Sequence, residues 1–527
     1  MTSASKLGAF VVARSDAPMR LDDLAREVPS AKVRGDGSVI VSGVKHDSRA
    51  VVAGDLFVAR RGAASDGSKF IEDARHRGAV AVAVDDRVVA ESLANAAIPV
   101  VQVDDSRVAL AYGSAAIYRH PSFSLDVVGV TGTNGKTTTA HLLRGAIDAS
   151  FGRAACGTIG TLGYTLGDRR ELASHTTPEA DDIARTMYAM RKLEATHVAM
   201  EVSSIALSLR RVDGVRFRVA AFTNFTQDHL DFHGSMEKYA EAKALLFTEH
   251  SPGVAVINID DPVGLELAKK VRGPLVRVST RRADADVVVS DLQEDKLGST
   301  ANVRALGKRF TLRTRLIGAH NIDNAAMTLA IGCALELDLE RVSHWFENEA
   351  GAPGRMERCD VPADDIVVLV DYAHTPDALL RVLQSVRGRT KAAVLCVFGC
   401  GGDRDMTKRR PMGAVAVHAD IVVITTDNAR SETPEAIAQA IEVGVIAGGM
   451  SGIASRGDRR GYLIELDRRK AIEWAVLRAL PGDLVVIAGK GHETVQITGS
   501  EARHFDDREV AREMLAARRA RDAGGGS

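Results

Sequence analysis

Short apolar runs alternate with longer helical patterns along most of the chain, and this alternation predicts an α/β fold. In the middle and last thirds of the chain the runs are almost wholly apolar, as expected for parallel strands that helices cover on both faces. The predicted strands are residues 39–44, 55–59, 79–84 and 99–103, then 125–130, 197–202, 219–225 and 254–259, and finally 366–370, 392–398, 421–425 and 484–488.

Two breaks divide this pattern into three blocks. The first is at His120 and Pro121, because the residue before a proline disfavours the helical conformation. The second is a segment rich in glycine and proline at residues 350–354. We therefore predict a smaller N-terminal α/β domain (1–123), a central domain with a parallel sheet like that of P-loop ATPases (124–352) and a C-terminal Rossmann-like domain (353–527). We expect the tail from Arg518 onward, which ends in Gly-Gly-Gly-Ser, to be disordered.

Composition narrows the class of partner. The net charge is −1, from 68 basic and 69 acidic residues, and such a balance argues against a broad role on nucleic acid or membrane surfaces. The five cysteines are widely spaced and show no disulfide or zinc pattern, which favours a reducing compartment. No apolar stretch is long enough to span a bilayer. We expect a cytoplasmic monomer that acts on small molecules.

The strongest single motif follows the predicted strand 125–130 and opens a helix. Its glycines let backbone N–H groups close around phosphate oxygens, and the helix N-terminus favours negative charge. Lys136 can neutralise the β- and γ-phosphates, and Thr137 can bind Mg²⁺. The strict phosphate-loop pattern would place a glycine at Val130, whereas the glycines here are at 129 and 132. The predicted ATP-binding residues of this loop are Gly132, Thr133, Asn134, Gly135, Lys136, Thr137 and Thr138.

Further polar residues follow the next predicted strands. Glu201 ends the strand 197–202, and the carboxyl ends of parallel strands line the ligand crevice of such a sheet, so Glu201 can bind the Mg²⁺ of the nucleotide. Residues 228–233 contain two histidines and two aspartates, among them His229, which favours a polar or metal-binding role. Lys243 lies near the apolar side of a predicted helix. Periodicity alone predicts a buried stem with the ammonium group in solvent.

Together these segments resemble the Mur ligase family, whose members add amino acids to the peptide stem of the bacterial cell-wall precursor. The resemblance covers nearly the whole chain. It implies an ATP-dependent, amide-bond-forming ligase that uses ATP and Mg²⁺, with successive blocks for a UDP-sugar, for ATP and for an amino acid. The matching segments are 47–49, 54–57, 131–138, 201–204, 228–231, 239–247, 318–324, 353–357, 371–377 and 398–405.

The resemblance also implies roles for individual residues. The catalytic set is Lys136, Lys243, Glu201 and His229. The implied Mg²⁺ ligands are Thr137, Glu201, His229 and Lys243, the last as a carbamate (N6-carboxylysine). The remaining ATP contacts are His320, Asn321, Asn324, Arg355 and Asp371. The contacts to the UDP-linked substrate are His46, Ser48, Ala63, Ala64, Ser65, Thr176, Thr177, Ser203 and Arg211. Ile205 and Leu209 depart from the family pattern, which has histidine at the first position and a polar contact at the second.

The implied amino-acid pocket consists of Arg404, Asp427, Asn428, Ala429, Arg430, Gly489 and Glu493. Members that add meso-2,6-diaminopimelate carry the arginine at position 430, and lysine-adding members lack it. Diaminopimelate has one more carboxylate than lysine, and an arginine fork answers it with two charge-assisted hydrogen bonds, while Glu493 can pair with the distal ammonium.

We therefore expect meso-diaminopimelate to be joined to the D-glutamyl carboxylate of UDP-N-acetylmuramoyl-L-alanyl-D-glutamate through an acyl phosphate, in peptidoglycan precursor synthesis. Three alternatives remain open. They are an L-lysine-adding ligase, another Mur or folylpolyglutamate-type ligase, and a non-catalytic nucleotide-binding protein.

Overall fold

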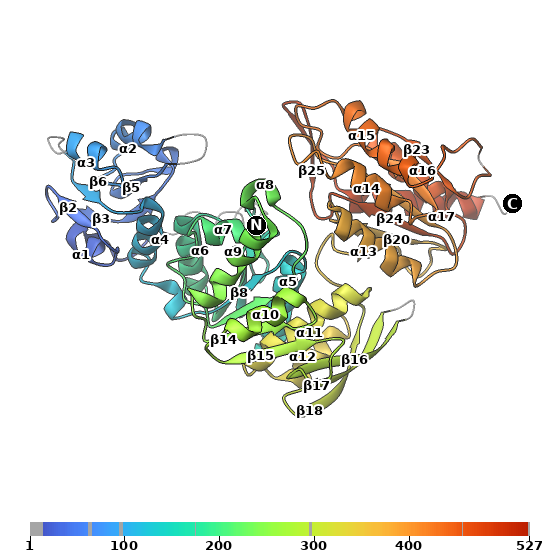
Figure 1. Cartoon of the computed structure of the whole chain (residues 1–527), viewed down its shortest axis with the longest axis horizontal. Helices are drawn as coiled ribbons and strands as arrows, with labels where there is room; N and C mark the ends of the chain where they lie inside the picture. Colours follow the sequence, from blue (N-terminus) through green and yellow to red (C-terminus); the bar gives the residue numbers. More distant parts are fainter. Residues whose placement is uncertain are drawn as a thin grey trace. The chain divides into compact units, whose positions relative to one another are not determined.

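The computed structural model describes residues 14–61, 66–93, 98–173, 175–294, 298–455 and 457–524. Their contacts form two compact units. Figure 1 labels helices and strands with the names used below. The first unit comprises the described residues within 1–225, 232–287 and 327–342, and the second those within 226–231, 288–326 and 343–527. Each unit is described by itself.

The first unit begins with a five-stranded sheet of order β2-β7-β6-β5-β4, in which only β2 is antiparallel to its neighbour. Apolar side chains of α1 and α4 pack on one face and those of α2 and α3 on the other. The strands of this sheet are β2 (Lys32–Arg34), β4 (Gly43–Lys45), β5 (Asp55–Ala59), β6 (Ala81–Val84) and β7 (Val100–Gln102), and β1 (Met19–Arg20) and β3 (Ile40–Val41) form a separate antiparallel pair. The helices are α1 (Leu21–Arg26), α2 (Ile71–His76), α3 (Arg87–Ser92) and α4 (Ser106–Ile117).

A second sheet of the first unit has the order β11-β10-β9-β12-β8-β13-β14-β15. It is parallel from β9 to β15, and only β10 and β11 run antiparallel. The strands are β8 (Asp126–Thr131), β9 (Cys156–Gly160), β10 (Gly163–Leu166), β11 (Arg169–Glu171), β12 (His197–Glu201), β13 (Val219–Phe222), β14 (Val254–Asn258) and β15 (Leu275–Ser279). The helices are α5 (Lys136–Phe151), α6 (Ala180–Lys192), α7 (Ser204–Ser208), α9 (Met236–Thr248) and α10 (Pro262–Lys270).

Three helices contain residues of both units: α8 (Leu230–His233), α11 (Ala319–Ala334) and α12 (Leu339–Phe346). The second unit contains the antiparallel pair β17 and β18 and a six-stranded sheet of order β19-β20-β24-β21-β22-β23, parallel except for β19. The strands are β16 (Val287–Glu294, whose first residue belongs to the first unit), β17 (Ser299–Ala305), β18 (Lys308–Thr314), β19 (Glu357–Arg358), β20 (Val367–Asp371), β21 (Val394–Phe398), β22 (Ile421–Ile424), β23 (Gly461–Ile464), β24 (Leu484–Ala488), β25 (Val495–Thr498) and β26 (Glu501–His504).

Helices cover both faces of this six-stranded sheet. The core on one face includes side chains of α13, α14 and α15, and the core on the other face includes side chains of α16 and α17. Burial on both sides explains why β21, β22 and β24 are continuous apolar runs. The helices are α13 (Pro376–Arg387), α14 (Arg409–Ala416), α15 (Pro434–Ala447), α16 (Arg468–Arg478) and α17 (Asp507–Gly524).

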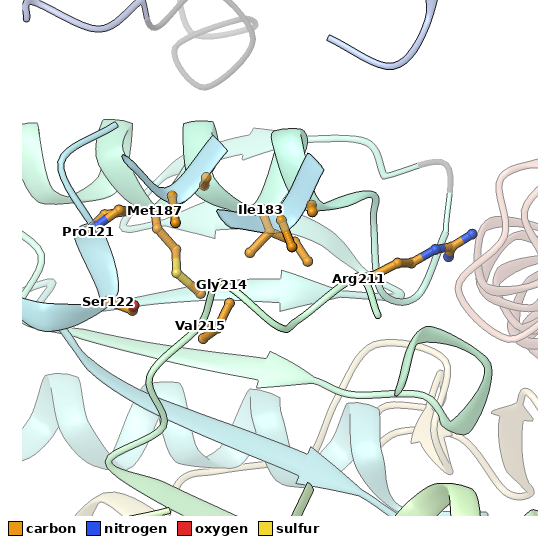
Figure 2. Close-up of a pocket in the computed structure, with 11 residues that line it drawn as sticks. Pro121, Ser122, Ile183, Met187, Arg211, Gly214 and Val215 are labelled. Atoms are coloured by element: carbon orange, nitrogen blue, oxygen red, sulfur yellow. The ribbon is translucent and has the colours of Figure 1, made fainter. Parts of the chain in front are cut away.

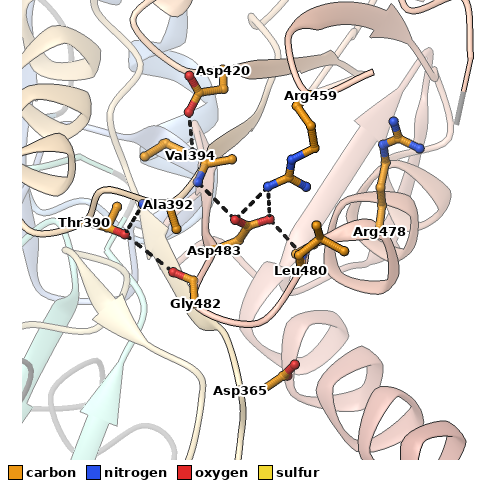
Figure 3. Close-up of polar contacts among 12 residues, drawn as sticks. Asp365, Thr390, Ala392, Val394, Asp420, Arg459, Arg478, Leu480, Gly482 and Asp483 are labelled. Carbon is orange, nitrogen blue, oxygen red and sulfur yellow. Dashed lines mark hydrogen bonds and ion pairs between the residues drawn. The ribbon is translucent and has the colours of Figure 1, made fainter. Parts of the chain in front are cut away.

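A polar network fixes the amino ends of two of these strands (Figure 3). Asp483, just before β24, accepts bonds from Arg459 Nη2 at 2.8 and 2.7 Å, from the backbone N–H of Ala393 at 3.0 Å and from that of Leu480 at 2.7 Å. These contacts hold β21 and β24 side by side. The opposite, carboxyl edge of the sheet is where ligands bind in parallel α/β folds.

The α/β prediction is confirmed, and the central sheet is parallel over the predicted strands. The expectation of a disordered tail is wrong for Arg518, which is 3% exposed within α17. Its guanidinium donates two bonds of 2.7 Å to Asp365. Residues 525–527 lie outside the described part of the chain. Among the described helices, none is both long enough and apolar enough to cross a membrane.

Candidate active site

The phosphate loop connects β8 to α5 as predicted. Gly132 and Gly135 have φ angles of 144° and 87°, which residues other than glycine rarely adopt. A Cβ at Gly132 would lie 1.9 Å from Thr223 Oγ1, so the loop needs glycine there for space as well. Lys136 Nζ donates to the carbonyl oxygens of Gly132 and Thr133, both at 2.9 Å. The loop therefore closes around its own lysine at the N-terminus of a 16-residue helix.

Two residues that follow β13 support the loop, and no role was predicted for them from the sequence. Thr223 Oγ1 donates to the carbonyl oxygen of Asn134 at 2.6 Å. The Asn224 side-chain oxygen accepts from the Asn134 N–H at 2.9 Å, and its carbonyl oxygen accepts from the Thr133 N–H at 2.8 Å. A Thr-Asn pair directly after a strand next to β8 was the available signal, because parallel neighbours end at the same edge of the sheet.

Glu201 and Thr137 are brought together as predicted. Glu201 is 2% exposed, and its Oε2 accepts a bond of 2.8 Å from Thr137 Oγ1. Thr161, which sequence reasoning missed, donates to the same carboxylate from its N–H at 2.7 Å and from its hydroxyl at 3.2 Å. Gly160 makes room for this arrangement, since a Cβ there would lie 2.3 Å from Glu201 Oε1. The hairpin of β9 and β10 thus fixes the carboxylate beside the loop.

Lys243 is buried, so the prediction of an ammonium group in solvent is wrong. The residue is 2% exposed, and its Nζ donates to the carbonyl oxygen of Gly132 at 2.8 Å. Its Nζ also lies 4.4 Å from the centroid of the Tyr239 ring, and the Tyr239 hydroxyl lies 3.2 Å from Thr133 Oγ1. The face of α9 that carries Lys243 therefore packs on the phosphate loop.

His229 belongs to the second unit, where Asp228 is its neighbour. Its backbone N–H donates to Asp228 Oδ1 at 2.8 Å, and its Nε2 lies 3.5 Å from Asp228 Oδ2. Its side chain is 41% exposed and its φ is 50°. Within the described ranges, no three or more His, Cys, Asp or Glu side chains gather closely enough to hold a metal ion. The hydroxyl of Thr137 and the carboxylate of Glu201 nevertheless suit Mg²⁺, which takes few protein oxygens and fills its shell with water and phosphate oxygens.

The residues expected to contact the UDP-linked substrate divide into two groups. Thr176, Thr177 and Ser203 lie around Glu201: Thr177 Oγ1 donates to the Glu201 carbonyl oxygen at 2.8 Å and accepts from the Ser203 N–H at 2.9 Å. Thr161 Oγ1 also lies 3.1 Å from Thr176 Oγ1. This group continues the hydrogen-bonded network of the phosphate loop.

The second group lies near the start of α6. His46 Nδ1 lies 2.9 Å from Asp181 Oδ1, and Ser48 is buried in a short 3₁₀ turn. Burial disfavours the charged imidazole, but the hydrogen bond and charge of Asp181 outweigh it and raise the pKa of His46. Arg211 Nη1 donates to the Thr177 carbonyl oxygen at 2.9 Å. Ala63, Ala64 and Ser65 lie outside the described residues.

The residues expected near adenine open α11 in a compact turn. Asn321 Nδ2 donates to the Ile317 carbonyl oxygen at 2.9 Å, and Asn324 Nδ2 donates to Asn321 Oδ1 at 3.3 Å. Burial lowers the pKa of His320 to about 4, so its imidazole is neutral near pH 7. A neutral ring can both donate and accept hydrogen bonds, which suits a base-recognition role.

Arg355 and Asp371 meet beside an aromatic side chain. The Arg355 guanidinium lies 4.4 Å from the centroid of the Tyr372 ring. Asp371, at the end of β20, accepts from the N–H groups of Met356 and Ala373, both at 2.7 Å. Burial raises the pKa of Asp371, while Arg355 and these N–H groups act in the opposite direction. The pair places a cation and a carboxylate at the carboxyl edge of the sheet.

Most residues of the expected amino-acid pocket converge at the same edge, after β22 and β24. Asn428 Nδ2 donates to Glu493 Oε2 at 2.9 Å. Arg430 Nη1 donates to the carbonyl oxygen of Gly402 at 2.7 Å. Ala429 is fully buried, and a Cβ at Gly489 would lie 2.7 Å from Asp427 Oδ2. These contacts bring together six of the seven predicted residues.

Arg404, the seventh, lies in an exposed loop and donates to the Asp403 carbonyl oxygen at 3.3 Å. It still flanks the pocket, because a Cβ at Gly401 would lie 3.0 Å from Arg430 Nη1 and 3.7 Å from Arg404 Cγ. Two arginines and Glu493 in this group of residues suit a ligand that carries both carboxylate and ammonium groups.

Lys490 is a pocket residue that the sequence did not single out. It is fully buried, and its Nζ donates to Glu493 Oε2 at 3.2 Å, to Asn428 Oδ1 at 3.3 Å and to the Val495 carbonyl oxygen at 2.7 Å. It therefore fixes the amide of Asn428 with its NH₂ group toward Glu493. Its position three residues before Glu493 was the available signal.

Comparison with known proteins gives consistent results. Three family models match in chain order: "Mur ligase family, catalytic domain" at 40–118, "Mur ligase middle domain" at 130–332 and "Mur ligase, glutamate ligase domain" at 354–491. The chain is 41% identical to the UDP-N-acetylmuramoyl-L-alanyl-D-glutamate--2,6-diaminopimelate ligase of Gloeobacter violaceus over 505 residues, which cover 95% of this chain and 99% of the relative.

Two further matches carry the same name. The ligase of Streptomyces coelicolor is 42% identical over 485 residues, covering 91% of this chain and 93% of the relative. A solved structure of a ligase of this name superposes with a TM-score of 0.68 at 31% identity, covering 95% of this chain and all of that one.

Proposed function

Because the chain belongs to the Mur ligase family, with that family's three α/β domains, we propose that it is the ATP-dependent ligase that joins meso-2,6-diaminopimelate to the D-glutamyl carboxylate of UDP-N-acetylmuramoyl-L-alanyl-D-glutamate. The product is a peptidoglycan precursor. The domain boundaries after residues 123 and 352 are part of this proposal.

The observation that carries the proposal is the pocket built around Asn428, Arg430 and Glu493. Arg430 is held by the Gly402 carbonyl oxygen with its planar fork beside Gly401, and Glu493 is fixed by Asn428 and Lys490. A carboxylate of diaminopimelate can pair with the arginine, and an ammonium group of the same molecule can pair with the glutamate. Lysine lacks that carboxylate and would leave the arginine facing no anion.

ATP and Mg²⁺ are assigned to the first unit's phosphate loop. The N–H groups of the loop and the start of α5 bind phosphate oxygens, and Lys136 moves from the Gly132 carbonyl oxygen to the phosphates. When bound, Mg²⁺ withdraws charge from the transferring phosphoryl group. Thr137 and Glu201 would hold it.

We assign Lys243 a second charge state, the carbamate formed when its neutral amine adds CO₂ and the nitrogen loses a proton to solvent. Its Nζ donates to the carbonyl oxygen of Gly132 and lies 4.4 Å from the centroid of the Tyr239 ring. The amine therefore contacts the loop that we propose binds ATP. A carbamate is an anion with two oxygens. It can therefore act as a carboxylate ligand for a second Mg²⁺, which a lysine ammonium cannot.

The chemistry then needs mainly positioning and electrostatics. The D-glutamyl carboxylate attacks the terminal phosphorus of ATP, and ADP leaves with the bond electrons. The amine of diaminopimelate attacks the acyl phosphate, the carbon–oxygen bond to phosphate breaks, and the nitrogen loses a proton. Glu201 and its neighbours Thr161 and Thr137 keep the loop in one geometry, so the acid and the phosphoryl group meet without reorganisation.

The test is phosphate release from ATP with the UDP-muramoyl dipeptide and one amino acid at a time. We expect release with meso-diaminopimelate and little with L-lysine or L-glutamate. Equal release with lysine would identify a lysine-adding ligase, and release with glutamate on a folate acceptor would identify a folylpolyglutamate-type ligase. ATP binding without amine-dependent release would identify a non-catalytic nucleotide-binding protein.

A further inference from the structure

Two arginines of the first unit share one carboxylate near the start of α6. Arg60 Nη1 lies 2.8 Å from Glu179 Oε2, and Arg211 Nη2 lies 2.8 Å from Glu179 Oε1. The side chains are 20% (Arg60), 11% (Arg211) and 13% (Glu179) exposed. Arg60 follows β5 in the N-terminal sheet, whereas Glu179 and Arg211 accompany the central sheet. We call this set the Arg60–Glu179–Arg211 cluster.

The cluster carries more positive charge and more donors than Glu179 can satisfy. Two guanidinium groups against one carboxylate leave a net charge of +1, and each guanidinium has five N–H donors. The Nε atoms of both Arg60 and Arg211 are buried without a hydrogen-bond partner among the described residues. The nearby Asp181 hydrogen-bonds to His46 Nδ1, and its charge raises the pKa of that imidazole. An unbalanced, largely buried cationic pair favours the binding of an anion.

The cluster also adjoins the predicted reaction centre. Arg211 Nη1 donates to the Thr177 carbonyl oxygen at 2.9 Å, and the Thr177 hydroxyl donates to the Glu201 carbonyl oxygen at 2.8 Å. Figure 2 shows Arg211 at one end of an apolar pocket lined by Ile183 and Met187, with its guanidinium pointing away from them. The anion therefore belongs to the part of the substrate that reacts, not to a distant group.

We propose that Arg60 is a substrate-binding residue, and that Arg60 and Arg211 together hold the carboxylate of the D-glutamyl residue that is not activated. This inference rests on the proposed function. A terminal D-glutamyl residue has two carboxylates, and only one becomes the acyl phosphate. The other is a small planar anion beside the reacting group, and two guanidinium forks match it in shape and charge.

Charge balance supports this assignment. With the substrate carboxylate in place, the net charge of the cluster falls from +1 to zero. Glu179 then acts as a positioning residue that keeps both forks in register.

The experiment replaces Arg60 by methionine, which keeps the length of the stem. The matched control is Arg61→Met, because Arg61 is adjacent, 63% exposed and pairs with Asp86 instead. Two acceptors are compared: the natural UDP-muramoyl dipeptide and the analogue whose non-reacting D-glutamyl carboxylate is a carboxamide. Affinity for each is measured by calorimetry, and KM and kcat by phosphate release, with thermal unfolding as a check of folding.

We expect Arg60→Met to weaken binding of the natural acceptor about 10- to 100-fold, as loss of a charge-assisted pair does, with kcat and the KM for ATP nearly unchanged. For the carboxamide analogue the same substitution should weaken binding by less than about threefold, because the effects of changing two interacting groups are not additive. Arg60→Lys should restore part of the affinity, and Arg61→Met should leave the affinity for both acceptors unchanged.

Equal weakening for both acceptors, or a lower unfolding temperature with unchanged affinity, would overturn the inference and make Arg60 a structural link. Failure of the proposed function looks different: the wild-type protein would release no phosphate with diaminopimelate. Calorimetry with the two acceptors would still decide the role of Arg60 in that case.

Discussion

The phosphate loop and the amino-acid pocket are each built around a fully buried lysine, but the two lysines have different surroundings. Lys243, 2% exposed, lies on the Gly132 carbonyl oxygen and the Tyr239 ring. Lys490, 0% exposed, donates to the carboxylate of Glu493, the amide of Asn428 and a carbonyl oxygen. Two lysines that are equally buried therefore need not have the same role.

The difference lies in what each lysine does for its neighbours. Lys490 compensates the charge of Glu493 and orients Asn428, so it would act through residues that we propose contact the amino acid. Lys243 lies against the backbone of the phosphate loop, so a change in its own charge would act directly on a nucleotide bound there. Four substitutions test this contrast, in order of decreasing expected effect.

Lys243→Ala should have the largest effect. Loss of a group that stabilises charge at the phosphates lowers kcat by about 10²- to 10³-fold. Short carboxylic acids should restore part of the activity of this variant, because they supply the lost carboxylate, and should not stimulate the wild-type protein. Phosphate release with and without added acid measures both. Unchanged activity of the variant would refute the carbamate.

Arg430→Ala should act on the amino-acid pocket alone. Two charge-assisted hydrogen bonds to the extra carboxylate are lost, so the KM for diaminopimelate should rise about 10- to 100-fold. The KM for ATP should stay the same, and the preference over lysine should fall. Undiminished use of diaminopimelate would remove the reason for assigning that amino acid.

Lys490→Met should have an intermediate effect on the same pocket. Without the ammonium the amide of Asn428 can rotate and Glu493 loses its partner, which should raise the KM for diaminopimelate about 5- to 10-fold. Lys470→Met on α16, an exposed lysine, is the matched control. Steady-state kinetics and thermal unfolding are measured together. A fall in kcat equal to that of Lys243→Ala would erase the contrast between the two lysines.

Tyr239→Phe should have the smallest effect. It removes the hydroxyl that lies 3.2 Å from Thr133 Oγ1 and keeps the ring beside Lys243. One neutral hydrogen bond corresponds to a change of about two- to fivefold in kcat/KM. Tyr239→Ala, which removes the ring as well, should be much more harmful. Equal activities of the two variants would show that the ring does not matter to Lys243.

Sequence patterns predicted the buried parallel strands well, because a short apolar run flanked by turns seldom adopts another structure. The strand β24 matches its prediction to the residue, and β12 and β14 differ by one residue at the carboxyl end. The antiparallel pair β10 and β11 was missed, since these strands are short and β11 is polar. The prediction of a disordered tail was wrong for Arg518, because composition does not show that its guanidinium binds Asp365.

The candidate site was predictable where a motif is local and unpredictable where partners come from distant segments. Lys136, Thr137 and Glu201 were found from strand ends and loop chemistry. The burial of Lys243 was not, because periodicity shows which face of α9 is apolar but not that the face meets a loop 111 residues away. Thr161 and Asn224 act through bonds that only the folded chain reveals.

The close approach at Gly160 has a consequence for reading natural or laboratory variation. A single added methyl group there would overlap the Glu201 carboxylate, although glycine itself carries no reactive group. In a saturation screen this position should score like a metal ligand, and a clinical or environmental isolate with alanine at 160 should be read as an inactivated allele, not as a neutral polymorphism.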